Sequence, residues 1–295
     1  VKEPAVYVKF RVVKTNVVVA SGASIVTSTS PFVDSFTYFL AWTTTPWTLP
    51  GNVALAVHPD ITYVLAQVGI EKYIIAEELA QKVLGDHKVL LSLKGEKLIG
   101  TKYEPLFRFK EPELGKKAYE VVPADFVAAQ DGTGIVHTAV AYGEDDFKLG
   151  KKENLAMLHL VDEEGKFTSG IWKGMFVKAA DPLIIEELKR QSLLFKEELY
   201  EHEYPFCWRC STPLLYYAKD SWFVNMQKVK VALLKNSSEI SWVPSHVKEG
   251  RFIEWLKEVR DWAFSRERYW GTPLPVWECK ECLASPDPAK RDKAF

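Results

Sequence analysis

The sequence predicts an α/β fold in which strands dominate the first third of the chain. Apolar and polar side chains alternate over residues 6–13, which is typical of a strand with one buried face. Residues 36–42, 54–58 and 62–68 are rich in β-branched and aromatic side chains, and turn-forming residues separate them. We therefore expect a sheet built early in the chain and helices added after it.

Length and composition limit the class of protein. A chain of 295 residues with 47% hydrophobic residues can bury a sizeable core in one or two domains. The 38 basic and 39 acidic residues give a net charge of −1, so composition alone offers no electrostatic argument for a nucleic-acid partner. Apolar runs are much shorter than the ~20 residues of a membrane-spanning helix, and no secretion signal opens the chain. We expect a cytoplasmic protein without a membrane partner.

Two helices are predicted from their end signals. Residues 76–84 carry helix formers and end at Gly85. Asp181 is followed by Pro182 and the amphipathic string LIIEELKRQ, which predicts an N-cap and a proline at the first helical position. The Gly/Ser/Thr/Val-rich residues 15–31 predict a loop or hairpin.

The middle of the chain predicts the order turn, strand, helix. Gly132-Thr133-Gly134 predicts a turn, residues 135–139 a short apolar strand, and Gly143 a helix start with acidic residues at its positive end. A dinucleotide loop is excluded at this turn because no third glycine follows at the required offset. Past residues 195–205, aromatic and proline-rich segments alternate with short helices such as 251–260, which predicts a domain boundary.

Four strings carry the functional information. They are WTTTPWTLPGN at 42–52, GTGIVHT at 132–138, GEDD at 143–146 and DWAFSRERYWGTP at 261–273. Together they resemble isoleucyl-tRNA synthetase of class I. The first string is specific because valyl and leucyl enzymes carry a T-T-R-P-type string there, and the last independently marks the isoleucyl branch. The resemblance covers nearly the whole chain, which we interpret as a fragment of a synthetase of the eukaryote-like type.

The resemblance implies a fold and a different function for each of two domains. It implies a mixed, β-barrel-like editing (CP1) domain with peripheral helices over residues 1–200, followed by part of a Rossmann-type catalytic domain over 201–295. Neither HIGH nor KMSKS, the ATP-handling strings of the family, occurs in this chain. ATP and magnesium are therefore expected in the parent enzyme only, and editing is expected to need no cofactor. The expected partners are tRNA(Ile) mischarged with valine, valine or isoleucine itself, and the rest of the synthetase.

Editing requires groups that bind an ammonium, orient an ester and hold a water. The resemblance gives ammonium binding to Asp146, with Asp145 as a capping neighbour, and makes His137 a wall that admits valine but not isoleucine; a general-base role for His137 is the alternative. Threonine hydroxyls can bind a ribose and a water. The residues expected to act in the reaction are Asp146, Thr44, Thr45 and His137, and those expected to bind substrate are Trp42, Thr43, Asn52 and Thr138.

Each of these residues also has an ordinary structural interpretation. Three consecutive threonines usually reflect β-propensity, an Asp-Asp pair at a helix start is normally a cap, and a lone histidine is more often a satisfied core residue. The flanking tryptophans and the spacing within 132–146 favour the functional interpretation.

Four cysteines form two Cys-x-x-Cys pairs, Cys207/Cys210 and Cys279/Cys282, which in a reducing compartment favour zinc over disulfides. Spacing alone permits one four-thiolate site. The resemblance implies two separate sites in the parent enzyme, each completed by cysteines outside this chain, and hence poor or absent zinc here.

Two competing functions stay open at this point. Residues 200–295 could serve as a tRNA-binding or positioning module beside a catalytically idle first part. Alternatively, the chain could edit in a valyl or leucyl enzyme, where threonine or norvaline would be the target; Thr44-Thr45-Pro46-Trp47 speaks against this.

Overall fold

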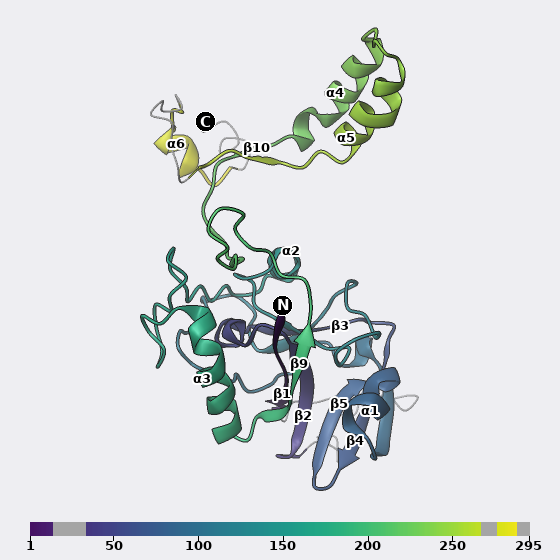
Figure 1. Cartoon of the computed structure of the whole chain (residues 1–295), viewed down its shortest axis with the longest axis vertical. Coiled ribbons are helices and arrows are strands. Elements are labelled where there is room, and N and C mark those ends of the chain that lie inside the picture. The colour runs from purple at the N-terminus through teal and green to yellow at the C-terminus, as the bar shows by residue number, and fades with distance from the viewer. Residues whose placement is uncertain (14–33, 267–275, 288–295) are drawn as a thin grey trace. The chain divides into compact units, whose positions relative to one another are not determined.

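The computed structural model describes residues 1–13, 34–266 and 276–287, and the chain divides into two compact units, Val1–Ala218 and Lys219–Phe295 (Figure 1). The expected loop at 15–31 and residues 267–273 of the fourth string lie outside the described residues. The described helices include none that combines the length and apolar character needed to cross a bilayer.

The first unit is a mixed sheet with helices around it. In chain order its elements are β1 (Lys2–Arg11), β2 (Thr37–Thr43), the 3₁₀ helix η1 (Pro46–Gly51), β3 (Ala54–Val57), β4 (Thr62–Val68), β5 (Glu71–Ala76), α1 (Glu77–Leu84), β6 (Lys88–Lys94), the 3₁₀ helix η2 (Gly95–Lys97), β7 (Glu120–Pro123), β8 (Val136–Thr138), α2 (Glu144–Glu153), α3 (Val177–Arg190) and β9 (Leu194–Glu201). The strands expected over 6–13, 36–42, 54–58 and 62–68 are confirmed as β1 to β4.

The sheet branches at β2, and this branching positions the loop that connects β2 to β3. Its strand order is β6-β4-β5-β2-β8-β3-β7, and β1 pairs with both β2 and β9. Along one edge of β2, residues 37–39 pair with β5, while Trp42 pairs with Val136 of β8. The sheet therefore curls into a half-barrel, as the expected barrel-like fold requires. The last residues of β2 lie beside β8.

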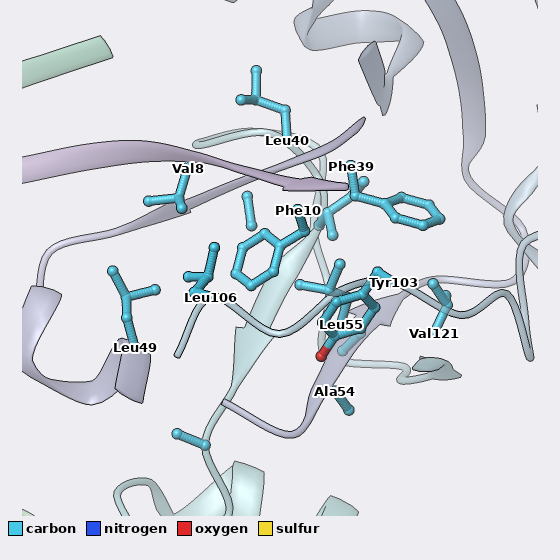
Figure 2. Close-up of a cluster of buried hydrophobic side chains, with 14 of the residues drawn as sticks. Val8, Phe10, Phe39, Leu40, Leu49, Ala54, Leu55, Tyr103, Leu106 and Val121 are labelled. Carbon is cyan, nitrogen blue, oxygen red and sulfur yellow. The ribbon is translucent and has the colours of Figure 1, made fainter. Parts of the chain in front are cut away.

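The core of this unit is formed by apolar side chains from several strands (Figure 2). Phe10 of β1 and Phe39 of β2 are fully buried, together with Leu55 of β3. The ring of Phe10 meets the ring of Tyr103 edge to face, with centroids 5.4 Å apart. This packing holds β1, β2 and β3 around one centre, which makes the loop at the end of β2 part of a rigid scaffold.

Three local predictions are confirmed. Helix α1 ends at Gly85, which adopts a φ of +68° that only glycine reaches without strain. Gly132 and Gly134 both have φ of +70°, which produces the expected turn before β8. Helix α2 begins after Gly143, with acidic residues in its first turn.

The start of α3 was predicted wrongly. The helix begins at Val177, so Pro182 lies inside it and Asp181 does not cap it. The carboxylate of Asp181 instead accepts a hydrogen bond from the backbone N–H of Trp47, 134 positions away, at 2.8 Å. A local N-cap pattern cannot reveal that the side chain is committed to a distant segment.

The second unit contains short elements. They are β10 (Phe223–Val224), α4 (Gln227–Glu239), the π-helical turn η3 (Lys248–Phe252), α5 (Ile253–Lys257), β11 (Trp262–Ala263) and α6 (Lys280–Leu283). Strands β10 and β11 form an antiparallel pair. The described residues of this unit include no parallel strand pair, and its assignment to a Rossmann-type domain, like the boundary near 200, stays a prediction.

Candidate functional site

The threonine string forms a tight loop between β2 and β3. Thr43 is the last residue of β2, and the 3₁₀ helix η1 begins at Pro46, whose fixed φ suits the first position of a helix. All six residues of η1 are buried. The loop therefore presents Thr44 and Thr45 from a packed base.

A hollow of about 300 Å³ lies between this loop and the start of α2. Its volume is at the lower end of the ~300–1,000 Å³ range of small-molecule sites. The residues that line it are Trp42, Thr43, Thr44, Thr45, Thr48, Val136, His137, Ala139, Tyr142 and Asp146. The GTGIVHT and GEDD segments, about ninety positions after the threonines, thus meet them at one cavity.

Asp146 supplies the carboxylate of the hollow. It lies in the first turn of α2, and its Oδ2 accepts a hydrogen bond from the backbone N–H of Ala139 at 2.9 Å. Burial raises the pKa of Asp146 to about 6, although the Ala139 hydrogen bond opposes this. A Cβ at Gly143 would lie only 3.3 Å from the Asp146 Cγ, so glycine lets the carboxyl pack against the helix start. Asp145 is exposed and lies 3.5 Å from the Lys148 ammonium.

Asn52 fixes the orientation and tautomer of His137. The Asn52 Nδ2 donates to the carbonyl of Ala54 at 2.9 Å, which sets the orientation of the amide, and it also donates to His137 Nδ1 at 3.0 Å. Its Oδ1 accepts from the Tyr103 hydroxyl at 2.6 Å. Because Nδ1 is an acceptor, the proton of the neutral imidazole is on Nε2.

The position of that proton determines which group donates in each of the next hydrogen bonds. His137 Nε2 donates to Thr48 Oγ1 at 2.9 Å, and the Thr48 hydroxyl donates to the carbonyl of Thr45 at 2.8 Å. Thr45 Oγ1, 3.2 Å from Thr48 Oγ1, must then donate to it, and Thr43 Oγ1, 3.2 Å from Thr45 Oγ1, must donate in turn. The Thr44 hydroxyl has no hydrogen-bond partner among the described residues. It is the threonine in this loop that is free to bind a substrate or a water.

His137 is a satisfied wall residue. The residue is 7% exposed, and burial lowers its pKa to about 4, so it is neutral at pH 7. Both ring nitrogens are engaged by protein groups. This geometry favours a shape-defining role over proton transfer.

The structure brings most of the expected residues together but separates two of them from the hollow. Trp42, Thr43, Thr44, Thr45, His137 and Asp146 line it. Asn52 is 3% exposed and lies behind the imidazole, and Thr138 is fully buried. Tyr142 and Thr48 line the hollow without having been expected. Tyr142 stands directly before GEDD, whereas no local signal marks Tyr103 as the partner of Asn52.

The cysteine pairs each form a short turn. The backbone N–H of Ser211 donates to the carbonyl of Cys207 at 2.8 Å, and the N–H of Cys282 donates to Cys279 Sγ at 3.3 Å. All four thiols are free. In the described part of the chain, no group of three or more His, Cys, Asp or Glu side chains is placed to hold a metal ion. The Cys-x-x-Cys spacing of each pair is that of half of a tetrahedral zinc site, and the metal-binding role of the four cysteines stays a prediction.

We expect the purified 295-residue chain to hold no stoichiometric zinc, because each pair supplies two of the four ligands that a structural site needs. Metal analysis after exhaustive dialysis, calibrated against protein concentration, checks this. One tightly held zinc per chain, released only when the thiols are modified, would contradict it and support a single four-thiolate site.

Comparisons with known proteins show the family to which the chain is related. Residues 13–284 match a family model described as tRNA synthetases class I (I, L, M and V). The isoleucine–tRNA ligase of Clostridium novyi is 55% identical over 255 residues, covering 84% of this chain and 24% of that protein. The isoleucine–tRNA ligase of Thermus thermophilus is 47% identical over 283 residues, covering 96% and 25%. The chain thus spans about a quarter of the length of these relatives, and the eukaryote-like type stays a prediction.

A solved structure shares the fold. The crystal structure of GlLeuRS-CP1 matches with a TM-score of 0.51 at 16% sequence identity, and the match covers 66% of this chain and 99% of that one.

Proposed function

The chain belongs to the class I tRNA synthetases, and from this premise we propose that its first unit hydrolyses valine from wrongly charged tRNA(Ile). The observation that carries the proposal is the shared hollow. The carboxylate of Asp146, the free hydroxyl of Thr44 and the neutral imidazole of His137 all line it. The carboxylate suits an ammonium group, and the volume suits a small side chain.

The substrate is bound by its charge and its size. Asp146, ionised above its pKa of about 6, pairs with the α-ammonium of the aminoacyl group through charge-assisted hydrogen bonds. His137 limits the depth of the hollow, so valine enters and the extra methylene of isoleucine does not. Such a filter is needed because the aminoacylation site of isoleucyl-tRNA synthetases discriminates these two amino acids by size only ~150-fold, a value known for this family of enzymes.

The reaction is direct attack of water on the ester carbonyl. The bond between the carbonyl carbon and the ribose oxygen breaks, the ribose oxygen takes a proton, and valine leaves as the free amino acid. In this proposal Thr44, whose hydroxyl is free, holds the water or the terminal ribose. Thr43, Thr45 and Thr48 fix the loop through their own hydrogen bonds. Positioning of reactants in this way can supply up to ~7–11 kcal/mol of the barrier.

For the parent protein we propose the ligation of isoleucine to tRNA(Ile), with ATP and magnesium held by segments that this chain does not contain. The absence of HIGH and KMSKS strings from the sequence supports this division. Zinc in the parent would be held by the two cysteine pairs together with further ligands.

We expect the 295-residue chain to release valine from Val-tRNA(Ile) faster than isoleucine from Ile-tRNA(Ile), by roughly the 10–200-fold that one methylene is worth. Release of radiolabelled amino acid from each charged tRNA, at protein concentrations high enough to offset weak tRNA binding, measures this. Release of valine no faster than in buffer would overturn the proposal and leave tRNA binding as the function of the chain.

A further inference from the structure

We infer that Asp181 is a positioning residue of the hydrolytic site, which acts by holding the threonine loop through the backbone of Trp47. The inference rests on the proposed function. Asp181 is on α3, outside the four strings that carry the family resemblance, and does not line the hollow. Its Oδ1 accepts the Trp47 N–H at 2.8 Å in a buried hydrogen bond.

The loop needs this partner because of how η1 begins. The first N–H groups of a helix have no acceptor within the helix. Pro46 has no N–H, and the N–H of Thr48 donates to the carbonyl of Thr45 at 3.0 Å. The N–H of Trp47 therefore has no acceptor within this fully buried helix. The side chain of the N-cap residue Thr45 does not accept it either. A buried N–H without an acceptor costs about 1–3 kcal/mol.

The contact bears directly on the reacting part of the site. Trp47 lies between Thr45 and Thr48, whose hydroxyls bond to each other and, through Thr48, to His137. A shift of the Trp47 backbone therefore moves the loop hydroxyls and the wall together. A displacement of ~1 Å can cost a hundredfold in rate when catalysis depends on positioning.

The surroundings of Asp181 disfavour the charged form of its carboxyl group. The residue is 9% exposed, and burial raises its pKa to about 7. Lys178 Nζ lies 3.9 Å from its Oδ2 but is bound at 2.9 Å to Glu3, whose negative charge repels that of Asp181 and also raises its pKa. His202 lies 3.6 Å from Glu3, and the Lys178 ammonium covers the ring of Tyr204. Lys178 thus compensates Asp181 only in part, so the carboxylate is not explained by an ion pair.

The first test compares Asp181→Asn with Asp181→Leu in the full chain. Asparagine keeps an acceptor for the Trp47 N–H, whereas leucine has a similar size and no acceptor. We expect Asp181→Asn to hydrolyse Val-tRNA(Ile) within about threefold of wild type and Asp181→Leu to lose at least about tenfold in kcat, with KM changed much less. Glu186→Leu, at an exposed carboxylate on the same helix, is the matched control and should behave as wild type.

A second measurement does not depend on activity and covers the case in which Asp181→Leu fails to fold. With ¹⁵N-tryptophan labelling, the Trp47 backbone amide should shift as pH is changed between about 6 and 8, because it reports the titration of its acceptor. In Asp181→Asn this pH dependence should vanish while the other tryptophan amides keep their positions.

The outcomes separate the two proposals. If wild type does not hydrolyse Val-tRNA(Ile), the proposed function fails, whatever the variants do. If wild type is active and Asp181→Leu matches it, or folded Asp181→Asn is as impaired as Asp181→Leu, the positioning role is wrong. A Trp47 amide that ignores both pH and Asp181→Asn also overturns it.

Discussion

Replacing Asp146 by asparagine should lower the hydrolysis of Val-tRNA(Ile) at least about a hundredfold at pH 7.5. Asparagine keeps an oxygen to accept the Ala139 N–H and so preserves the start of α2, but it removes the charge that binds the ammonium. Charge-assisted hydrogen bonds of this kind are among the strongest in proteins, and truncating one buried charged partner typically costs ~2–5 kcal/mol. Single-turnover deacylation measures the loss.

The same substitution should stabilise the protein above pH 6. Burial raises the pKa of Asp146 from 3.8 to about 6, so the folded state holds this proton more tightly than the unfolded state. Below about pH 4 the carboxyl is protonated in both states and does not lower the free energy of unfolding. As pH rises from about 4 to 6, the buried carboxyl lowers the free energy of unfolding more and more, and above pH 6 this loss is constant. Asp146→Asn should gain about 1–3 kcal/mol in unfolding free energy at pH 8 and nothing at pH 4. Urea unfolding at the two pH values checks the sign.

A substrate analogue separates ammonium binding from proton transfer. tRNA(Ile) carrying the α-hydroxy counterpart of valine has no ammonium, so wild type and Asp146→Asn should hydrolyse it at similar slow rates. A large difference on this substrate would assign Asp146 to the chemistry of water instead. Wild-type activity on Val-tRNA(Ile) should also decline as pH falls through about 6, because a protonated Asp146 cannot pair with the ammonium.

Local sequence signals were sufficient where a feature depends on neighbouring residues. The φ of +70° at Gly132 and the acidic first turn of α2 follow from residue types at fixed offsets. The convergence of the threonine loop with Asp146 could be expected only from the family resemblance, because strand alternation does not state which strands pair. The branching of the sheet at β2 is what brings these segments together.

The support of the site was not visible in the sequence, because it consists of single hydrogen bonds over long separations. Tyr103 reaches Asn52 across 51 positions, and Asp181 reaches Trp47 across 134. Neither contact leaves a periodic pattern, and the Asp181-Pro182 pair even imitates a helix start. Asn52 was expected to touch substrate, whereas its position behind His137 leads us to propose that it holds the imidazole in one tautomer.

His137→Ala should abolish the discrimination between valine and isoleucine. Removing the imidazole deepens the hollow at the wall that limits the side chain, so isoleucine fits without a clash. The rate on Ile-tRNA(Ile) should rise by about 10–200-fold, toward the rate on Val-tRNA(Ile), which should change little. The variant should lose stability, by about 1–3 kcal/mol, because two buried hydrogen bonds disappear; Asn52 and Thr48 each keep a backbone partner. Parallel deacylation assays on both charged tRNAs give the ratio.

Measuring both rates decides between the two roles of His137, because the roles predict different results on the mischarged substrate Val-tRNA(Ile) and on the correctly charged Ile-tRNA(Ile). A general base lost to alanine would slow the hydrolysis of Val-tRNA(Ile), and Ile-tRNA(Ile) would stay intact. A lost wall leaves the first reaction running and starts the second. Nδ1 already accepts a hydrogen bond from Asn52 and Nε2 donates to Thr48, and a pKa of about 4 makes the imidazole a weak base, so the structure favours the second outcome. His87→Ala, on the turn after α1, controls for the loss of an imidazole as such and should alter neither rate.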